Sequence, residues 1–81
     1  MIYKIKIRPK ALKFIEKQSK IQRTRIYKAI YTLPNGDVKK MAGYKNNYRL
    51  RVGDYRIIYE LNQAELIILI TKINNRGQIY K

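Results

Sequence analysis

The residues with the clearest chemical potential are three arginines spaced around a short turn near the middle of the chain. Arg49 and Arg51 precede Gly53 and Asp54, and Arg56 follows them. If Gly53 and Asp54 form a two-residue turn, which glycine in the first position permits, Arg51 lies opposite Arg56 in a β-hairpin. Like charges directly across a strand pair are destabilising. The pattern therefore predicts an anion site, because guanidinium groups suit the geometry of phosphate.

The composition of the whole chain also indicates an anionic ligand. Its 81 residues include 19 Lys and Arg but only 5 Asp and Glu, which gives a formal net charge of +14. The natural counterpart of such a surface is a polyanion. An acidic protein that neutralises the self-repelling charge is a second expectation, compatible with the first. An AT-rich coding sequence would also enrich Lys, so Arg is the more informative residue type.

Cysteine and histidine are both absent from the sequence. The first absence excludes disulfides and thiolate chemistry, and the second removes the commonest metal ligand and acid-base group. We therefore expect neither a metal nor a cofactor. Residues 1–7 alternate in polarity and lack the apolar run of a signal peptide, and no stretch approaches the length of a membrane span. A single domain over residues 1–81 with a cytoplasmic location, away from membranes, is predicted.

The first half of the chain predicts one strand and two helices. Apolar and basic residues alternate over residues 3–8, which is typical of a half-buried strand at a sheet edge. Pro9 is favoured at the first position of a helix, here extending to about residue 18. Ser19 with Gln22 matches a capping box for a second helix, which ends at Pro34. The two helices are expected to form a helical hairpin.

The second half predicts three strands after a basic loop. Residues 35–45 show no strong periodicity, whereas residues 48–52 and 55–61 alternate, with tyrosine and aliphatic side chains on one face and the arginines on the other. Residues 66–70 are apolar throughout, as in a central strand covered on both faces. The predicted fold class is α+β, in the order β-α-α-β-β-β, with a helical hairpin packed on one face of an antiparallel sheet.

The element order and several short motifs resemble the RelE/ParE toxin superfamily over nearly the whole chain. The motifs are residues 39–43, the hairpin of residues 48–59, and Arg76 four residues before Tyr80. The resemblance implies a small toxin encoded with an acidic antitoxin that wraps it. In the RelE branch it further implies a ribosome-dependent endoribonuclease that cuts mRNA in the A site and inhibits translation. In the ParE branch it implies an inhibitor of DNA gyrase.

The resemblance also assigns roles to individual residues. Arg56 matches the RelE-branch arginine that stabilises the scissile phosphate, and Arg49 matches a basic position of the first hairpin strand. Arg76 matches a C-terminal basic position close to Tyr80. Tyr80 matches the tyrosine that activates the 2'-hydroxyl or stacks on a base. Asparagine stands at three positions where some members carry basic residues, which leaves the general acid unassigned: Asn47, Asn74 and Asn75.

Metal-free RNA cleavage requires a base, cations that hold the developing phosphorane charge, and an acid for the leaving oxygen. Tyr80 is the best base if cations crowd it, because positive charge favours phenolate, although its reference pKa of about 10 requires a large depression. Otherwise Tyr80 positions the nucleotide or packs as an ordinary aromatic residue. Arg49 or a loop lysine is a candidate hydrogen-bond donor to the leaving group. The residues expected to bind RNA are Lys39, Lys40, Lys45 and Arg51.

Several alternatives to a RelE-like endoribonuclease stay open from the sequence. The three hairpin arginines could form a solvated face without a ligand. The asparagines favour a ParE-like toxin that binds gyrase without nuclease activity, and a non-catalytic RNA-binding module is a third candidate. The RelE interpretation requires that Arg56 and Tyr80 converge within reach of one nucleotide.

Overall fold

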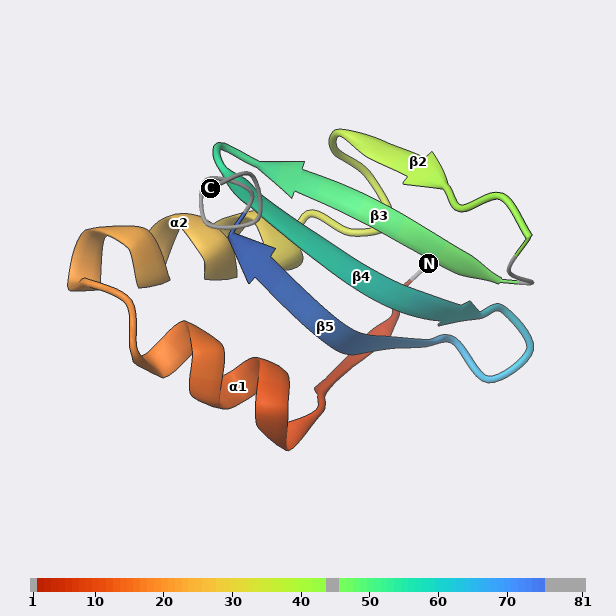
Figure 1. The fold of residues 1–81 in the computed structure, drawn as a ribbon. Helices are drawn as coiled ribbons and strands as arrows, with labels where there is room; N and C mark the ends of the chain where they lie inside the picture. The colour runs from red at the N-terminus through yellow and green to blue at the C-terminus, as the bar shows by residue number, and fades with distance from the viewer. Residues whose placement is uncertain (1, 44–45, 76–81) are drawn as a thin grey trace.

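A computed structural model describes residues 2–43 and 46–75 of the protein, and these residues form two helices and five strands (Figure 1). None of the helices described is long and apolar enough to cross a membrane. The elements in chain order are β1 Lys4–Ile7, α1 Pro9–Glu16, α2 Lys20–Ile30, β2 Val38–Lys40, β3 Asn47–Val52, β4 Tyr55–Asn62 and β5 Ile67–Asn75. The α+β class and the helical hairpin on one face of the sheet are confirmed.

The five strands form one mixed sheet in the order β1-β5-β4-β3-β2. All neighbouring strands are antiparallel except β1 and β5, which are parallel and pair Lys4 with Ile67 through Ile7 with Ile70. The prediction of an entirely antiparallel sheet is therefore wrong at one edge. The direction of β1 depends on how the two helices return the chain to the far edge of the sheet, and no local pattern in the sequence encodes that path.

The predicted basic loop of residues 35–45 contains a short strand. Val38 pairs with Leu50 and Lys39 pairs with Arg49, so β2 forms the edge of the sheet beyond β3. Three residues are too few to show a period of two, which is why the strand had no signal in the sequence. Lysines suit this position because charged side chains discourage pairing of an exposed edge with another chain.

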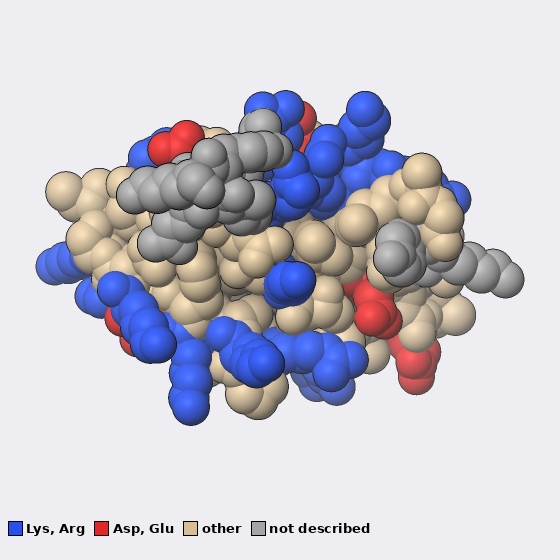
Figure 2. All heavy atoms as spheres, viewed as in Figure 1, with Lys and Arg blue, Asp and Glu red and all other residues tan. Residues whose placement is uncertain are grey.

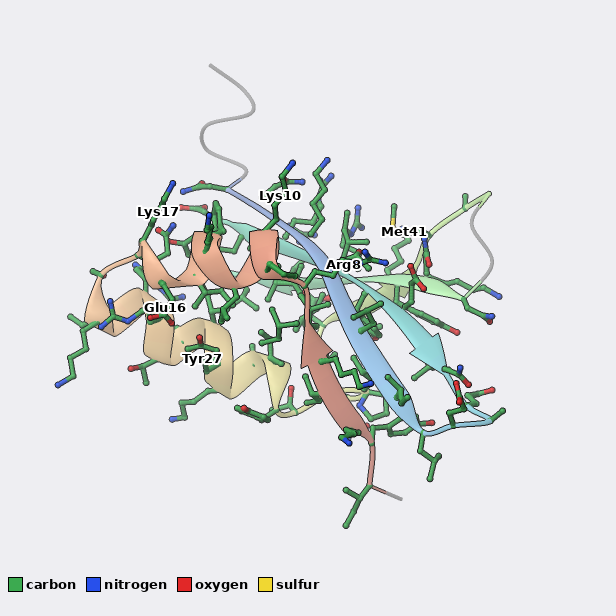
Figure 3. All side chains as sticks on the ribbon, turned by 90° about the horizontal axis from the view of Figure 1, so that it is seen from below. Arg8, Lys10, Glu16, Lys17, Tyr27 and Met41 are labelled. Atoms are coloured by element: carbon green, nitrogen blue, oxygen red, sulfur yellow. The ribbon has the colours of Figure 1, made fainter. Side chains whose placement is uncertain are left out.

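Both helices begin where local sequence signals predict. Pro9 is the first residue of α1. The side-chain oxygen of Ser19 accepts a hydrogen bond of 3.3 Å from the backbone N–H of Gln22 and caps α2. The helices are joined by the Tyr27 hydroxyl, which donates to a Glu16 carboxylate oxygen at 2.9 Å (Figure 3). Burial and this hydrogen bond both raise the pKa of Tyr27.

The hydrophobic core lies between the helices and one face of the sheet. Ile15 of α1 and Ile26 of α2 are fully buried against residues of the central strands such as Ile57. Burying each such side chain contributes about 1.5–3 kcal/mol to folding. Tyr55 is also buried, and its hydroxyl donates to Gln18 Oε1 at 2.9 Å. The prediction that the apolar face of the hairpin is core material is confirmed.

The expectation that β5 is covered on both faces is wrong. Ile68 and Ile70 are fully buried beneath the helices, but Ile67 and Leu69 point to the other face and are only half-buried. These two residues lie beside Lys4 and Lys6 of β1, whose aliphatic stems can cover apolar neighbours while their amino groups remain in water. We call this uncovered side of the sheet the open face.

Candidate functional site

The hairpin of β3 and β4 has the register that the sequence predicts. Val52 pairs with Tyr55 around the turn, Arg51 lies opposite Arg56, and Arg49 lies opposite Ile58. Gly53 has φ +57°, and a Cβ at this position would lie 3.0 Å from Arg25 Nη2 of α2. The turn therefore requires glycine for its backbone conformation, whereas the flexible end of the Arg25 side chain could move away from a methyl group.

Five cationic side chains share the open face in two neighbouring rows across the sheet, and we call them the basic face. Blue atoms gather over β2, β3 and β4 in Figure 2, and further cations line the lower edge of the same view. Paired positions give the first row as Lys39, Arg49, Ile58 and Lys72, and the second row as Arg51, Arg56 and Asn74. The basic face thus comprises Lys39, Arg49, Arg51, Arg56 and Lys72.

Sequence reasoning did not include Lys72 in the site, because simple alternation with the buried Ile70 directs it into the core. The structure has an irregularity there: Tyr59 pairs with Ile70 and Ile58 pairs with Lys72, so Thr71 is an extra residue on β5. The Thr71 hydroxyl donates to the Ile58 carbonyl at 3.1 Å. This bulge reverses the alternation and moves Lys72 to the open face, as bulges often do where side chains must be redirected.

Two arginines of the basic face carry buried donors that have no partner among residues 2–43 and 46–75. The Nε atoms of Arg49 and Arg56 are inaccessible to solvent and make no hydrogen bond within the described part of the chain. An unsatisfied buried donor costs about 1–3 kcal/mol, and more when the group is charged. Because these atoms are inaccessible even to water, a phosphate would have to bind at the other nitrogen atoms of the two guanidinium groups. Their burial argues against a purely solvated arginine surface, and a bound anion would offset the charge of the half-buried guanidinium groups.

A small hollow lies beside Arg49 at the β2 edge. It has a volume of about 230 Å³ and is lined by Lys39, Lys40, Met41, Ala42 and Arg49. Lys39 pairs with Arg49 and belongs to the basic face, whereas Lys40 pairs with Tyr48 and also lines the hollow. Two of the lysines expected to bind RNA therefore border the arginines.

Three predicted site residues, Lys45, Arg76 and Tyr80, lie outside the described residues. The convergence of Arg56 and Tyr80 on one nucleotide accordingly stays a prediction. Asn74 lies directly opposite Arg56, so the position where some family members carry a basic residue holds a neutral amide next to the predicted phosphate site.

Among the hairpin tyrosines, Tyr59 is unsuited to act as a base. Tyr48 and Tyr59 stack with ring centroids 5.6 Å apart and an interplanar angle of 16°. Tyr59 is 1% exposed, and its burial, together with the neighbouring Tyr48, raises its pKa to about 12. A raised pKa makes the phenolate less available at neutral pH. Over residues 2–43 and 46–75 there is also no group of three or more metal-ligating side chains.

A comparison with models of protein families shows which family the chain belongs to. Residues 5–80 match the model of the ParE toxin of type II toxin-antitoxin systems, parDE. The chain belongs to the RelE/ParE toxin superfamily. It is thus a RelE-like toxin of a type II toxin-antitoxin system, as its solved relatives also indicate.

The toxin is similar to several archaeal members of this superfamily. It is 46% identical over 44 residues to the toxin RelE3 of Methanocaldococcus jannaschii, an alignment covering 54% of this chain and 48% of that protein. The chain thus spans about half the length of the curated relatives it matches. The crystal structure of the RelE-RelB complex of Pyrococcus horikoshii contains a chain of 31% identity, with a TM-score of 0.82 and coverage of 96% of this chain and 99% of that one.

A second solved structure gives the same result. The RelB-RelE antitoxin-toxin complex of Methanococcus jannaschii contains a chain of 29% identity, with a TM-score of 0.73 and coverage of 93% of this chain and 94% of that one. The Escherichia coli RelBE complex, at 18% identity, covers 90% of this chain and 95% of that one with a TM-score of 0.76, and shows the likeness of fold alone.

Proposed function

We propose that this toxin is a ribosome-dependent, metal-free endoribonuclease that cleaves mRNA in the A site and thereby inhibits translation. The observation that carries the proposal is the half-buried pair Arg49 and Arg56 on the basic face, whose buried Nε atoms have no hydrogen-bond partner among the described residues. A phosphate that arrives from solvent would bind at the remaining guanidinium nitrogens of these two arginines, and the surrounding cations would hold the charge that develops as its phosphorus is attacked.

The chemistry assigned to the site follows from the roles of its cations. Arg56 and Arg76 stabilise the phosphorane, and Tyr80 acts as the base or positions the nucleotide. Arg49 donates a hydrogen bond to the leaving oxygen. It does not transfer a proton to that oxygen, because the arginine guanidinium is not deprotonated in proteins. The remaining cations of the site bind neighbouring phosphates: Lys39, Lys40, Lys45, Arg51. Such a site depends on positioning by the ribosome, so activity on free RNA is expected to be low.

An acidic antitoxin is the second partner that we propose. The solved relatives from Pyrococcus horikoshii and Methanococcus jannaschii are complexes of RelE with RelB. A formal net charge of +14 on 81 residues strongly favours association with an acidic chain. An antitoxin that covers the basic face would neutralise the Arg51 and Arg56 pair and exclude RNA from the same donors.

A ParE-like inhibitor of DNA gyrase without nuclease activity is the second candidate. Asn74 places a neutral amide opposite Arg56 where some members have a cation, and the matching family model is that of ParE toxins. Fewer cations around the phosphate would weaken transition-state stabilisation without affecting binding to a protein target. A non-catalytic RNA-binding module is the remaining alternative.

One experiment separates these candidates. Purified toxin is added to ribosomes programmed with an mRNA codon in the A site, cleavage is mapped by primer extension, and gyrase supercoiling is measured with the same sample. Site-specific cuts with normal supercoiling are expected. Intact mRNA with blocked supercoiling would replace the proposal by the ParE-like function, and RNA binding without either effect would leave a binding module.

A further inference from the structure

Lys72 is the cation of the basic face to which the proposed reaction has so far given no role. The Thr71 bulge turns it to the open face, where it pairs with Ile58. It is exposed and makes no hydrogen bond or ion pair with other described residues. A cation that the strand redirects to the ligand side, and that has no partner there among the described residues, is available to the ligand.

The first row of the basic face places Lys72 and Arg49 on opposite sides of Ile58. Ile58 of β4 pairs with Arg49 of β3 on one side and with Lys72 of β5 on the other. Neighbouring strands lie about 4.8 Å apart, so the backbones of the two cationic residues are about 10 Å from each other. Both side chains are long, and that of lysine is a flexible four-carbon stem. An atom of a ligand above Ile58 therefore lies within reach of both head groups.

Arg56 adds a third cation from the second row. It precedes Ile58 by two residues on β4, which is about 7 Å along the strand, and its side chain shares the open face. In this arrangement a phosphate contacts Arg56 while its leaving oxygen lies above Ile58, between Arg49 and Lys72.

The leaving oxygen needs a proton that arginine does not supply. Departure of a 5'-oxygen creates an alkoxide, which is a far stronger base than an amine. Arginine stays protonated in proteins, whereas a lysine ammonium has a reference pKa of about 10.4 and gives its proton to such a base. The sequence has no histidine, so lysine is the residue type with this ability on the basic face. The two lysines of this face are Lys39 and Lys72.

Position in the row distinguishes these two lysines. Lys39 lies on β2 beyond Arg49, so Arg49 stands between it and Ile58. Lys72 lies directly beside Ile58 and is the single cation of β5. The lysine that can reach the leaving oxygen without passing another cation is therefore Lys72.

We propose that Lys72 is the general acid of the cleavage reaction and gives its proton to the leaving 5'-oxygen. This inference rests on the proposed endoribonuclease function and fills the role that the sequence left unassigned. The 2'-oxygen loses its proton to the base and bonds to phosphorus, while the bond between phosphorus and the 5'-oxygen breaks. The products are a 2',3'-cyclic phosphate and a 5'-hydroxyl that carries the proton from Lys72. Lys72 becomes a neutral amine and, being exposed, regains a proton from water.

Replacing the leaving oxygen by sulfur tests the proposal, because a thiolate departs without a proton. Thiols are much stronger acids than alcohols, and the thiol of cysteine has a reference pKa of about 8.5. Ribosomes are programmed with mRNA that carries either the natural linkage or a 5'-bridging sulfur atom at the cleaved bond. Single-turnover cleavage rates are measured on both mRNAs with the wild-type toxin and with each variant.

Two substitutions of Lys72 separate proton donation from positive charge. Lys72→Ala removes both, whereas Lys72→Arg keeps the charge without a transferable proton. Both variants should cleave the natural linkage at least about 100-fold more slowly than the wild type, since general acid catalysis contributes about 100- to 10,000-fold. Both should cleave the sulfur linkage at nearly the wild-type rate, which would also show that the variants are folded and bind the ribosome.

Lys6→Ala is the matched control, because Lys6 is an exposed lysine on the open face of β1 beside Leu69. It should cleave both linkages at the wild-type rate. Arg56→Ala should remain slow on both linkages, because the phosphorane charge needs stabilisation whichever atom leaves.

Three results would overturn the proposal: wild-type cleavage of the natural linkage by either Lys72 variant, slow cleavage of the sulfur linkage by these variants, or rescue by sulfur of Lys39→Ala instead. The same assay distinguishes this inference from the proposed function. A wild-type toxin that cuts neither linkage rejects the endoribonuclease activity and the role of Lys72 with it. Cleavage by the wild type together with any of the three results rejects the role of Lys72 alone.

Discussion

The two faces of β4 show the difference between residues that stabilise this toxin and residues that serve its ligand. Tyr55, Ile57 and Tyr59 point beneath the helices and are between 0% and 7% exposed. Arg56 and Ile58 alternate with them and point to the open face, where they are half-buried. Successive side chains of β4 thus lie alternately in the hydrophobic core and on the charged open face.

The energies on the two faces explain why the fold tolerates the arginines. Each fully buried apolar side chain contributes about 1.5–3 kcal/mol, whereas a pair of like charges across two strands costs at most about 1 kcal/mol. The core therefore easily offsets the repulsion between Arg51 and Arg56. The Arg51 and Arg56 pair destabilises the free protein, and an anionic ligand would supply the negative charge that relieves this repulsion.

The sharpest test of the contrast compares neighbouring residues of β4. Ile57→Ala should lower the free energy of unfolding by about 2–5 kcal/mol, because it leaves a cavity in the core. Ile58→Ala, on the open face, should cost only about 1 kcal/mol. Urea unfolding monitored by circular dichroism measures both variants, and equal losses would show that the open face is as tightly packed as the core.

Arg56→Ala should show the opposite of the Ile57→Ala result, with a large loss of cleavage activity and little loss of stability. Removing a donor that stabilises transition-state charge lowers the cleavage rate by about 100- to 1000-fold. The free energy of unfolding should stay constant or rise slightly, because the repulsion with Arg51 is relieved. Primer extension on programmed ribosomes and urea unfolding measure the two effects.

The matched control for Arg56→Ala is Arg51→Ala, which removes an exposed charge from the opposite strand position. Its Nε is not among the buried, unpartnered donors, so we expect cleavage to fall by less than tenfold, about one decade of rate. Unchanged cleavage by Arg56→Ala would remove the catalytic assignment from this arginine.

Stability should depend moderately on the turn of Gly53 and Asp54, which aligns the two arginine rows. Gly53→Ala forces a left-handed conformation on a residue with a Cβ, which costs about 1–2 kcal/mol, and the new methyl group approaches Arg25. Asp54→Ala in the same turn should change the free energy of unfolding by less than about 0.5 kcal/mol. Thermal or urea unfolding measures the stability of both variants. Equal losses of stability in the two variants would contradict this account.

A further effect is confined to alkaline pH and concerns the core face. Burial raises the pKa of Tyr59 to about 12, whereas an unfolded tyrosine titrates near 10. Its contribution to stability is therefore fully present below about pH 10 and is lost as the pH rises towards 12. Tyr59→Phe removes this ionisation, so its stability should fall less than that of the wild type between these pH values in parallel urea titrations.

Local patterns in the sequence predicted much of the fold. Ser19 with Gln22, Pro9 and the Gly53 turn act through neighbouring residues, and their structures are as expected. The same locality explains why the arginines of the hairpin were placed correctly. Where the pattern was short, as in β2, or where alternation was interrupted, as at Thr71, prediction from the sequence was incomplete or wrong.

The sequence by itself determined the charge, the capping of the helices, the register of the hairpin and the division of β3 and β4 into a core face and a basic face. These properties depend on residue type and on contacts close along the chain. Only the tertiary structure decided the parallel pairing of β1, the redirection of Lys72, and the burial of the Arg49 and Arg56 Nε atoms without a partner among the described residues. Each of these depends on segments distant in sequence, whose packing no local periodicity records.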